Sequence, residues 1–230
     1  MGVRNIPLST GCAIVNEKCS LREFGRVCVF SIVKFILKVF ILFYHRPEIK
    51  NKANLPKSGA VVLVGNHASY LDPIYIGALL ERRVHFMAKQ ELFKNRFSSM
   101  FFNLVGSFAV DRDKPDLKTF KTAFKYLGQG EVVGLFPEGT IKSHNSFDEI
   151  KQGAAYLALK VKAEVVPVFI EGTKRAMKDI SWIKPVKIRV WIGKPIHSTS
   201  LGTFKEQRIN LSSKIQASLQ ELSEQVNKAT

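Results

Sequence analysis

The stretch VVLVGNHASYLDP, residues 61–73, changes from apolar to polar within one short segment. Four consecutive aliphatic residues, 61–64, are typical of a strand that is buried on both faces. An imidazole and a carboxylate then follow at His67 and Asp72. Pro73 is typical of the first turn of a helix, where the amide hydrogen that proline lacks is not needed. The stretch therefore predicts a buried strand, a polar loop and a helix.

Short apolar runs alternate with helical patterns over the rest of the chain. Strands are predicted at residues 60–64, 84–88, 107–110, 132–136, 164–170 and 186–192, and helices at residues 73–81, 91–104, 117–128, 152–162 and 204–227. This alternation is typical of an α/β fold in which helices flank a mixed, largely parallel central sheet. Because ligands bind beyond the carboxyl ends of strands in such sheets, polar residues at those ends are candidate site residues.

Such residues follow four of the predicted strands. They are His67 and Asp72 after the first, Arg112 after the third, Glu138, Gly139 and Thr140 after the fourth, and Glu171, Gly172 and Thr173 after the fifth. A histidine can remove a proton from an alcohol, and a carboxylate on its other ring nitrogen fixes the tautomer. The spacing of five between His67 and Asp72 suits such a pair if a turn separates them.

Each of these groups also has a structural interpretation. Asp72 could cap the helix that begins at Pro73, even while it contacts His67. Arg112 could form a surface ion pair, although its guanidinium also suits a phosphate. The Glu-Gly-Thr segment at residues 138–140 could be a simple turn, or its amides and hydroxyl could bind an oxyanion.

Taken together, four blocks resemble the glycerolipid acyltransferase family, and within it most closely the bacterial 1-acyl-sn-glycerol-3-phosphate acyltransferases. The blocks are His67-x-x-x-x-Asp72, GSFAVDR at residues 106–112, FPEGT at residues 136–140 and VPVFIEG at residues 166–172. Their order and separations match, and the resemblance covers about residues 25–200.

The resemblance implies that His67 is the general base for the free sn-2 hydroxyl of 1-acyl-glycerol 3-phosphate. The hydroxyl oxygen would attack an acyl thioester directly, with acyl carrier protein or coenzyme A as donor, and give phosphatidic acid. Asp72 would orient His67 and offset its developing charge. Other implied acceptors are glycerol 3-phosphate, another lysophospholipid or a glycolipid.

The resemblance also implies a set of substrate-binding residues. Arg112 would hold the acceptor phosphate, with Lys89 as a weaker candidate. Glu138, Gly139 and Thr140 would line the glycerol-phosphate site, and residues 167–172 would shape the acyl or carrier side. Family members commonly have an arginine directly after the Glu-Gly-Thr block, whereas this chain has Ile141 and then Lys142. Lys142 would supply a point charge without bidentate geometry.

The residues themselves favour direct transfer without a cofactor. The chain has no G-x-S-x-G motif, and its three cysteines, Cys12, Cys19 and Cys28, all precede the main domain. An odd number of cysteines without a framework argues against a disulfide-stapled domain. No zinc, phosphate-loop or dinucleotide motif is present, so we predict neither a metal nor a nucleotide cofactor. His144 is the rival base, whereas His85 is expected within a strand, as a core or edge residue, and His45 and His197 at the surface.

The positive charge of the chain lies in its flanks. Residues 1–58 carry ten Lys and Arg against three acids, residues 174–230 carry eleven against four, and the middle carries fourteen against twelve. Basic flanks favour contact with a polyanionic surface, either phospholipid or nucleic acid. A non-catalytic basic membrane- or nucleic-acid-binding module is therefore the alternative class of function. The near-neutral middle argues against nucleic acid.

The apolar segment at residues 27–44 favours the membrane surface. Its polar residues fall within a stripe roughly 60° wide at about 100° per residue. They are Ser31, Lys34 and Lys38, with His45 just beyond. This pattern is typical of an amphipathic helix in the membrane interface, and a buried helix or a transmembrane span are the alternatives. We predict a membrane-associating segment at residues 1–58 that holds a catalytic domain, residues 59–230, on the cytoplasmic face of the inner membrane.

Overall fold

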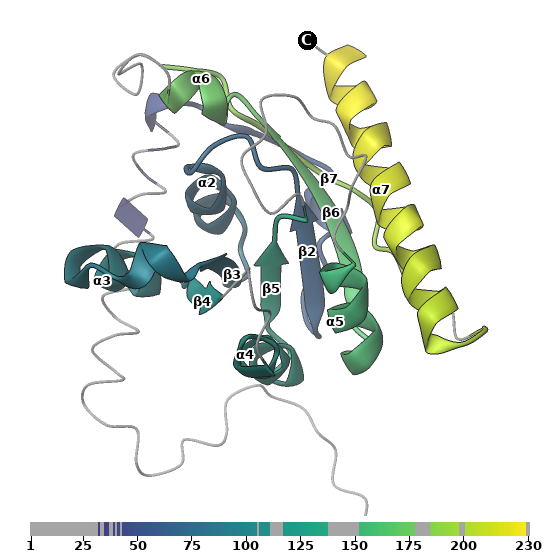
Figure 1. Cartoon of the computed structure of the whole chain (residues 1–230). Helices are drawn as coiled ribbons and strands as arrows, with labels where there is room; N and C mark the ends of the chain where they lie inside the picture. The colour runs from purple at the N-terminus through teal and green to yellow at the C-terminus, as the bar shows by residue number, and fades with distance from the viewer. Residues whose placement is uncertain are drawn as a thin grey trace, which may run out of the picture.

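The computed structural model describes residues 43–104, 106–110, 117–137, 152–177, 185–197 and 201–228, together with residues 32, 35, 36, 39 and 41. A sheet of seven strands runs through the middle of this part of the chain, in the order β1-β7-β6-β2-β5-β3-β4 (Figure 1). The strands are β1 (Glu48–Lys50), β2 (Val61–Gly65), β3 (Val84–Lys89), β4 (Phe108–Val110), β5 (Val132–Leu135), β6 (Glu164–Glu171) and β7 (Arg189–Ile192).

The sheet is mixed and largely parallel. The pairing of β6 with β7 is antiparallel, and every other pair of neighbouring strands is parallel. The carboxyl ends of β2, β3, β4, β5 and β6 therefore lie along one edge of the sheet. The expected α/β fold with a mixed, largely parallel sheet is confirmed.

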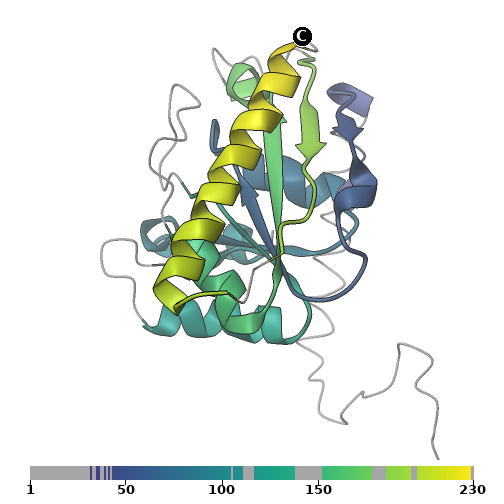
Figure 2. The same cartoon turned by 90° about the vertical axis from the view of Figure 1, so that its right-hand side faces the viewer.

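Helices cover both faces of the sheet. In Figure 1, α2 lies on one side, and α5 and α7 lie on the other. Figure 2 shows α7 crossing in front of the sheet next to α5. The helices are α2 (Asp72–Leu79), α3 (Arg96–Leu104), α4 (Leu117–Gly128), α5 (Gly153–Val161), α6 (Thr173–Met177) and α7 (Phe204–Lys228), with 3-10 turns η1 (Lys52–Asn54) and η2 (Gln90–Phe93).

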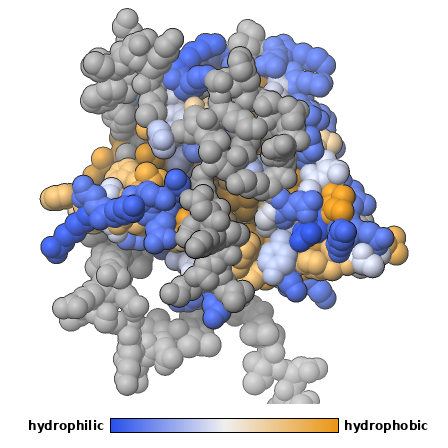
Figure 3. Space-filling view, in the orientation of Figure 1, coloured by the Kyte–Doolittle hydropathy of each residue, from blue (hydrophilic) through white to orange (hydrophobic). Residues whose placement is uncertain are grey.

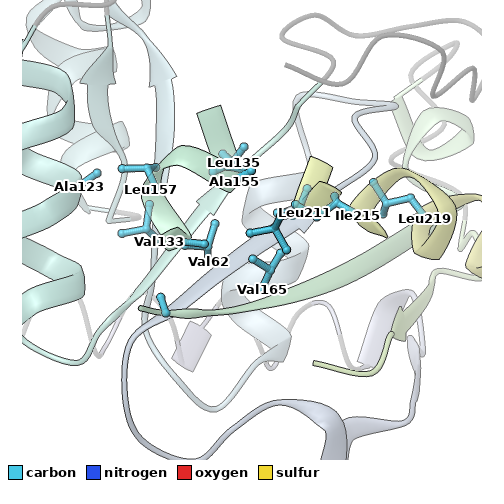
Figure 4. Packing of buried hydrophobic residues seen from close by; sticks show 14 of the residues in the cluster. Val62, Ala123, Val133, Leu135, Ala155, Leu157, Val165, Leu211, Ile215 and Leu219 are labelled. Atoms are coloured by element: carbon cyan, nitrogen blue, oxygen red, sulfur yellow. The ribbon is translucent and has the colours of Figure 1, made fainter. Parts of the chain in front are cut away.

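Side chains of β2 alternate between two apolar clusters, one on each face. Val62 and Val64 pack with α4, α5 and α7, and Val61 and Leu63 pack with α2 and β7. All of β2 is buried because helices cover both faces of this central strand. The α7-side cluster includes Val62, Ala123, Val133, Leu157, Val165, Leu211 and Ile215 (Figure 4). It also includes Phe169, and the α2-side cluster includes Val61, Leu63, Ile76, Phe86, Phe136, Val168 and Ile170.

The sheet begins earlier in the chain than the sequence pattern indicates. Strand β1 pairs in parallel with β7, with Glu48 opposite Arg189. Because β1 precedes residue 59, the end of the expected membrane segment contributes an edge strand to the central sheet. The division of the chain at residues 58 and 59 otherwise stays a prediction.

The end of the N-terminal helix docks on the body of the domain. Ile41 is buried in the α2-side cluster, and the His45 ring meets the Tyr75 ring of α2 edge-on at 5.7 Å. His45 Nδ1 also lies 3.2 Å from the backbone nitrogen and oxygen of Val186. The expectation of an exposed His45 is therefore wrong, because the last turn of this helix packs inward.

Most of the predicted segment at residues 27–44 lies outside the described residues, Lys34 and Lys38 included. The residues that are described, 32, 35, 36, 39, 41, 43 and 44, have helical backbone. Of the helices described by the structure, none combines the length and the apolar character that crossing a membrane requires.

Candidate active site

The candidate site lies where three neighbouring parallel strands end. His67 follows β2, Phe136 follows β5, and Thr173 follows β6. These strands are adjacent, since β2 pairs with both β5 and β6. The sheet therefore brings together side chains that are far apart in the sequence.

His67 and Asp72 form a hydrogen-bonded pair. The distance between His67 Nδ1 and Asp72 Oδ2 is 3.0 Å. The Asp72 side chain is 0% exposed and the His67 side chain 10%. The expected contact across a turn is thus present, with the carboxylate buried and the imidazole at the edge of solvent.

The surroundings of Asp72 determine which nitrogen of His67 carries the proton. The backbone amides of Ala68 and Ser69 both donate to Asp72 Oδ2, each over 2.8 Å. An oxygen that accepts two amide hydrogens is an acceptor toward the imidazole as well, so His67 Nδ1 is the donor. The lone pair then lies on Nε2, which makes no hydrogen bond within the described residues. That is the tautomer a general base needs.

Asp72 does not cap helix α2. The residue at the N-cap position is Leu71, and no side chain caps the helix there. The loop before the helix turns tightly, because the Asp72 amide donates to the Ser69 carbonyl and the Leu71 amide to Ser69 Oγ. The carboxylate consequently points back to the loop amides that precede it. The expected capping role is wrong, because the Asp72 side chain forms its hydrogen bonds with the loop amides and with His67.

Thr173 holds the second carboxylate oxygen. Its hydroxyl donates to Asp72 Oδ1 over 2.5 Å, and both side chains are fully buried. The preceding residue, Gly172, has φ +94°, and a Cβ there would lie 2.3 Å from the Lys187 carbonyl oxygen. Only glycine fits this turn, which brings Thr173 from the end of β6 to Asp72. The sequence indicated the turn but not this contact.

Asn66 ties the histidine loop to the same strand. Its side chain donates to the Ile170 carbonyl over 2.9 Å and accepts from the Ile170 amide over 2.7 Å. This two-point contact fixes the end of β2 against β6 one residue before His67. The end of β6 therefore holds the loop that carries His67 and Asp72. Two of the β6 residues expected on the acyl or carrier side, Val168 and Ile170, are instead buried in the α2-side cluster.

An aromatic stack supports the imidazole ring. Phe136 lies parallel to His67, with the ring centroids 4.2 Å apart and the planes at 12°. Phe86 stacks on Phe136 at 5.6 Å and 5°. A Cβ on Gly134 would lie 2.5 Å from the Phe86 ring, so glycine in β5 makes room for it. Sequence analysis named Phe136 only as the first residue of the FPEGT block and gave neither ring a role at the site, because ring stacking between strands leaves no local pattern.

Most of the expected substrate-binding residues cannot be placed. Arg112, Glu138, Gly139, Thr140 and Lys142 lie outside the described residues, as does the rival base His144. Lys89 is described and ends β3, at the same edge of the sheet as His67. Its exposed ammonium lies 3.6 Å from Glu91 Oε1.

Two other described ionisable groups, Glu171 and His85, have structural partners. Glu171 accepts a hydrogen bond from Arg189 over 3.0 Å. His85 is buried and stacks on Tyr126 at 3.7 Å, and burial lowers its pKa to about 4. His197 is exposed, as expected. Among the described residues, no three His, Cys, Asp or Glu side chains form a group that could hold a metal ion.

Comparison with known proteins identifies the family. The family model described as "Acyltransferase" matches residues 46–171, which is more than half of the chain. The chain belongs to the acyltransferase family and is an enzyme of that class.

The most similar relatives agree on one activity. The 1-acyl-sn-glycerol-3-phosphate acyltransferase of Bacillus subtilis strain 168 is 35% identical over 162 residues, covering 70% of this chain and 79% of that protein. The protein of the same name from Streptococcus pneumoniae is 28% identical, covering 71% of this chain and 61% of its own length. The human 1-acyl-sn-glycerol-3-phosphate acyltransferase beta is 31% identical over 69% of this chain and 59% of its own length.

A solved structure confirms the fold. The crystal structure of the 1-acyl-sn-glycerophosphate (LPA) acyltransferase PlsC from Thermotoga maritima superposes with a TM-score of 0.65. The match covers 87% of this chain and 83% of that one, at 23% sequence identity.

Proposed function

We propose that this enzyme transfers a fatty acyl group from a thioester to the sn-2 hydroxyl of 1-acyl-glycerol 3-phosphate. The observation that carries the proposal is the His67–Asp72 pair, whose buried carboxylate leaves Nε2 as the basic nitrogen at the strand ends. The activity named for the curated relatives supports the choice of substrate.

The proposed reaction is a direct transfer. His67 Nε2 takes the proton of the acceptor hydroxyl while the oxygen attacks the thioester carbonyl carbon. The carbon–sulfur bond of the tetrahedral intermediate then breaks, and the imidazolium returns the proton to the leaving thiolate. Asp72 stabilises the imidazolium and keeps Nδ1 protonated throughout. No acyl-enzyme forms, because the acceptor oxygen itself is the nucleophile.

The acceptor phosphate would be bound by cations around the strand ends. Arg112 is the principal candidate, with Lys142 and Lys89 as weaker ones, and Glu138, Gly139 and Thr140 would surround the glycerol. Lys89 supports this arrangement by its place at the carboxyl edge of β3. The donor would be acyl carrier protein or coenzyme A.

The enzyme would work at the cytoplasmic face of the inner membrane. Five apolar side chains of the N-terminal helix are exposed at helical spacing: Ile32, Phe35, Ile36, Val39 and Phe43. Because Ile41 and His45 face the domain, the helix presents this apolar stripe outward. An outward apolar stripe in a basic flank supports an interfacial helix. Deletion of residues 1–46 should release most of the protein from membranes.

A panel of acceptors tests the proposed substrate. The purified full chain is incubated with an acyl thioester of either donor class and with 1-acyl-glycerol 3-phosphate, 1-acyl-glycerol or glycerol 3-phosphate. We expect phosphatidic acid as the preferred product, and an Arg112→Ala variant should raise KM for the acceptor more than it lowers kcat. Preference for the acceptor without phosphate would contradict both the substrate and the role of Arg112.

A further inference from the structure

Helix α3 presents a second apolar face to solvent. Phe97 is 79% exposed, Met100 66% and Phe101 40%. At spacings of three and four residues, these side chains lie on one face of the helix. Exposed apolar groups that are contiguous, rather than scattered singly, mark a surface that contacts another molecule.

The helix is held to the domain from another side. Phe102 packs against Phe93 of η2, with 5.5 Å between the ring centroids. In Figure 1, α3 projects from the body of the molecule on the side of α2, away from α5 and α7. Its exposed face is therefore not part of either apolar cluster of the domain.

Cations flank the apolar face. Lys94 and Arg96, both exposed, stand at the amino end of α3. Glu91, the described acid nearest to them in the sequence, lies 3.6 Å from the Lys89 ammonium. Figure 3 shows hydrophobic and strongly hydrophilic side chains next to each other over this projecting region. Lys94 and Arg96 form no ion pair with another described residue. Aromatic and thioether groups beside such cations are complementary to the interface of an anionic bilayer, where acyl chains and headgroup phosphates adjoin.

Helix α3 is connected to the same edge of the sheet as the candidate site. The 3-10 turn η2, which carries α3, begins directly after Lys89 at the carboxyl edge of the sheet. Tyr70, in the loop between His67 and Asp72, is exposed as well. A bilayer that met α3 would thus meet the edge of the sheet at which His67 lies.

We propose that α3 is a membrane-docking element of its own, separate from the N-terminal helix. Phe97, Met100 and Phe101 enter the interface of an anionic phospholipid bilayer, and Lys94 and Arg96 contact the headgroup phosphates. This contact holds the edge of the sheet against the bilayer, so that a lipid acceptor reaches His67 without leaving the bilayer. The last step rests on the proposed function, whereas the docking itself does not.

Tryptophan quenching tests the docking directly. Phe97→Trp and Ile209→Trp variants of the full chain are mixed with vesicles of phosphatidylcholine and phosphatidylglycerol whose acyl chains are brominated. Ile209 is the matched control, because it is an exposed apolar residue on α7, on the opposite side of the sheet (Figure 1). Bromine should quench the emission of Phe97→Trp well beyond that of Ile209→Trp, with the native Trp182 and Trp191 common to both. Equal quenching in the two variants would overturn the proposal.

Activity tests the consequence for the acceptor. A Phe97→Ser/Met100→Ser variant should lose about tenfold or more in transfer to a vesicle-borne acceptor, since each large apolar side chain removed from the interface costs at least that much in partitioning. Its transfer to a short-chain, water-soluble acceptor and its Tm should match those of an Ile209→Ser control. A fall in Tm would show that another part of the chain covers this face, and would overturn the proposal.

Two further outcomes separate the docking from the proposed reaction. If the native chain acylates neither acceptor, the proposed function fails while the quenching result for α3 stands. Replacing Lys94 and Arg96 by Gln should lower transfer in vesicles with phosphatidylglycerol more than in phosphatidylcholine alone. An equal effect in both would remove the anionic lipid from the proposal.

Discussion

The hydroxyl of Thr173 donates a 2.5 Å hydrogen bond to Asp72 Oδ1, although 101 positions separate the two residues in the sequence. His67 and two loop amides bind the other carboxylate oxygen, Oδ2. Asp72 is therefore held from two sides, by its own loop and by the end of β6. The orientation of His67 consequently depends on β6, although His67 and Asp72 both follow β2.

Replacing Thr173 by Val should impair catalysis through Asp72. The change keeps the shape but removes one buried hydrogen bond to a charged group, which is worth about 1.5–3 kcal/mol. We expect kcat to fall ~10- to 100-fold with little change in KM for the acceptor. Steady-state kinetics of the purified variant measures both constants.

Thr173→Ser is the control for that change, because it retains the hydroxyl. It should restore most of the kcat that Thr173→Val loses. If Ser and Val give the same kcat, the hydrogen bond does not position Asp72, and Thr173 has only a packing role.

Replacing Phe136 by Leu should loosen the His67 ring. The ring stack at 4.2 Å disappears, and such pairs are worth about 0.5–1.5 kcal/mol beyond their buried area. We expect kcat to fall about 2- to 10-fold. Phe169→Leu is a matched control, since Phe169 is buried in the α7-side cluster, on the other face of the sheet from Phe136. That control should lower Tm and leave kcat unchanged; an equal loss of kcat in both variants would contradict a role for the stack.

Protonation of His85 should destabilise the fold in acid. Burial holds its pKa at about 4, below the ordinary value of 6.5, so the unfolded state binds the proton more readily. Stability is thus fully present above pH 6.5 and is lost as the pH falls toward 4. The shift corresponds to a loss on the order of 3 kcal/mol across this range.

Urea unfolding at several pH values measures this loss. His85→Phe keeps the stacking on Tyr126 and has no titrating group, so its stability should vary less between pH 6.5 and 4. If the native chain and the variant showed the same pH dependence, another group would be responsible.

The fold could be predicted because its elements have strong local patterns. The aliphatic run of β2 indicates a buried strand, and the helical spacing of apolar residues in α4 indicates an amphipathic helix. Helix α4 spans residues 117–128, as predicted. Strand β1 was missed because its three residues, Glu48–Lys50, contain a single apolar side chain between two charges. Its partner β7 supplies the pairing, and no local pattern shows that.

The candidate site was predictable where its contacts are local, and where a residue such as Thr173 follows the end of a strand. The contact between His67 and Asp72 lies within one loop, so spacing and a strand end indicated it. The contacts of Thr173 and Phe136 join separate elements, and sequence spacing does not encode them. The predicted capping role of Asp72 is wrong, because its carboxylate accepts hydrogen bonds from amides of the preceding loop and not from amides of helix α2.

The most direct test of the proposed mechanism is the rate of acyl transfer by the His67→Ala and Asp72→Asn variants. Each variant is first shown to have the Tm of the native chain, and its rate is then compared with the native rate. Without the base, transfer should fall to the background rate, and Asp72→Asn should lose ~10²- to 10⁴-fold because an amide no longer keeps the proton on Nδ1. Near-native turnover by a folded His67→Ala protein would contradict general-base catalysis by this residue.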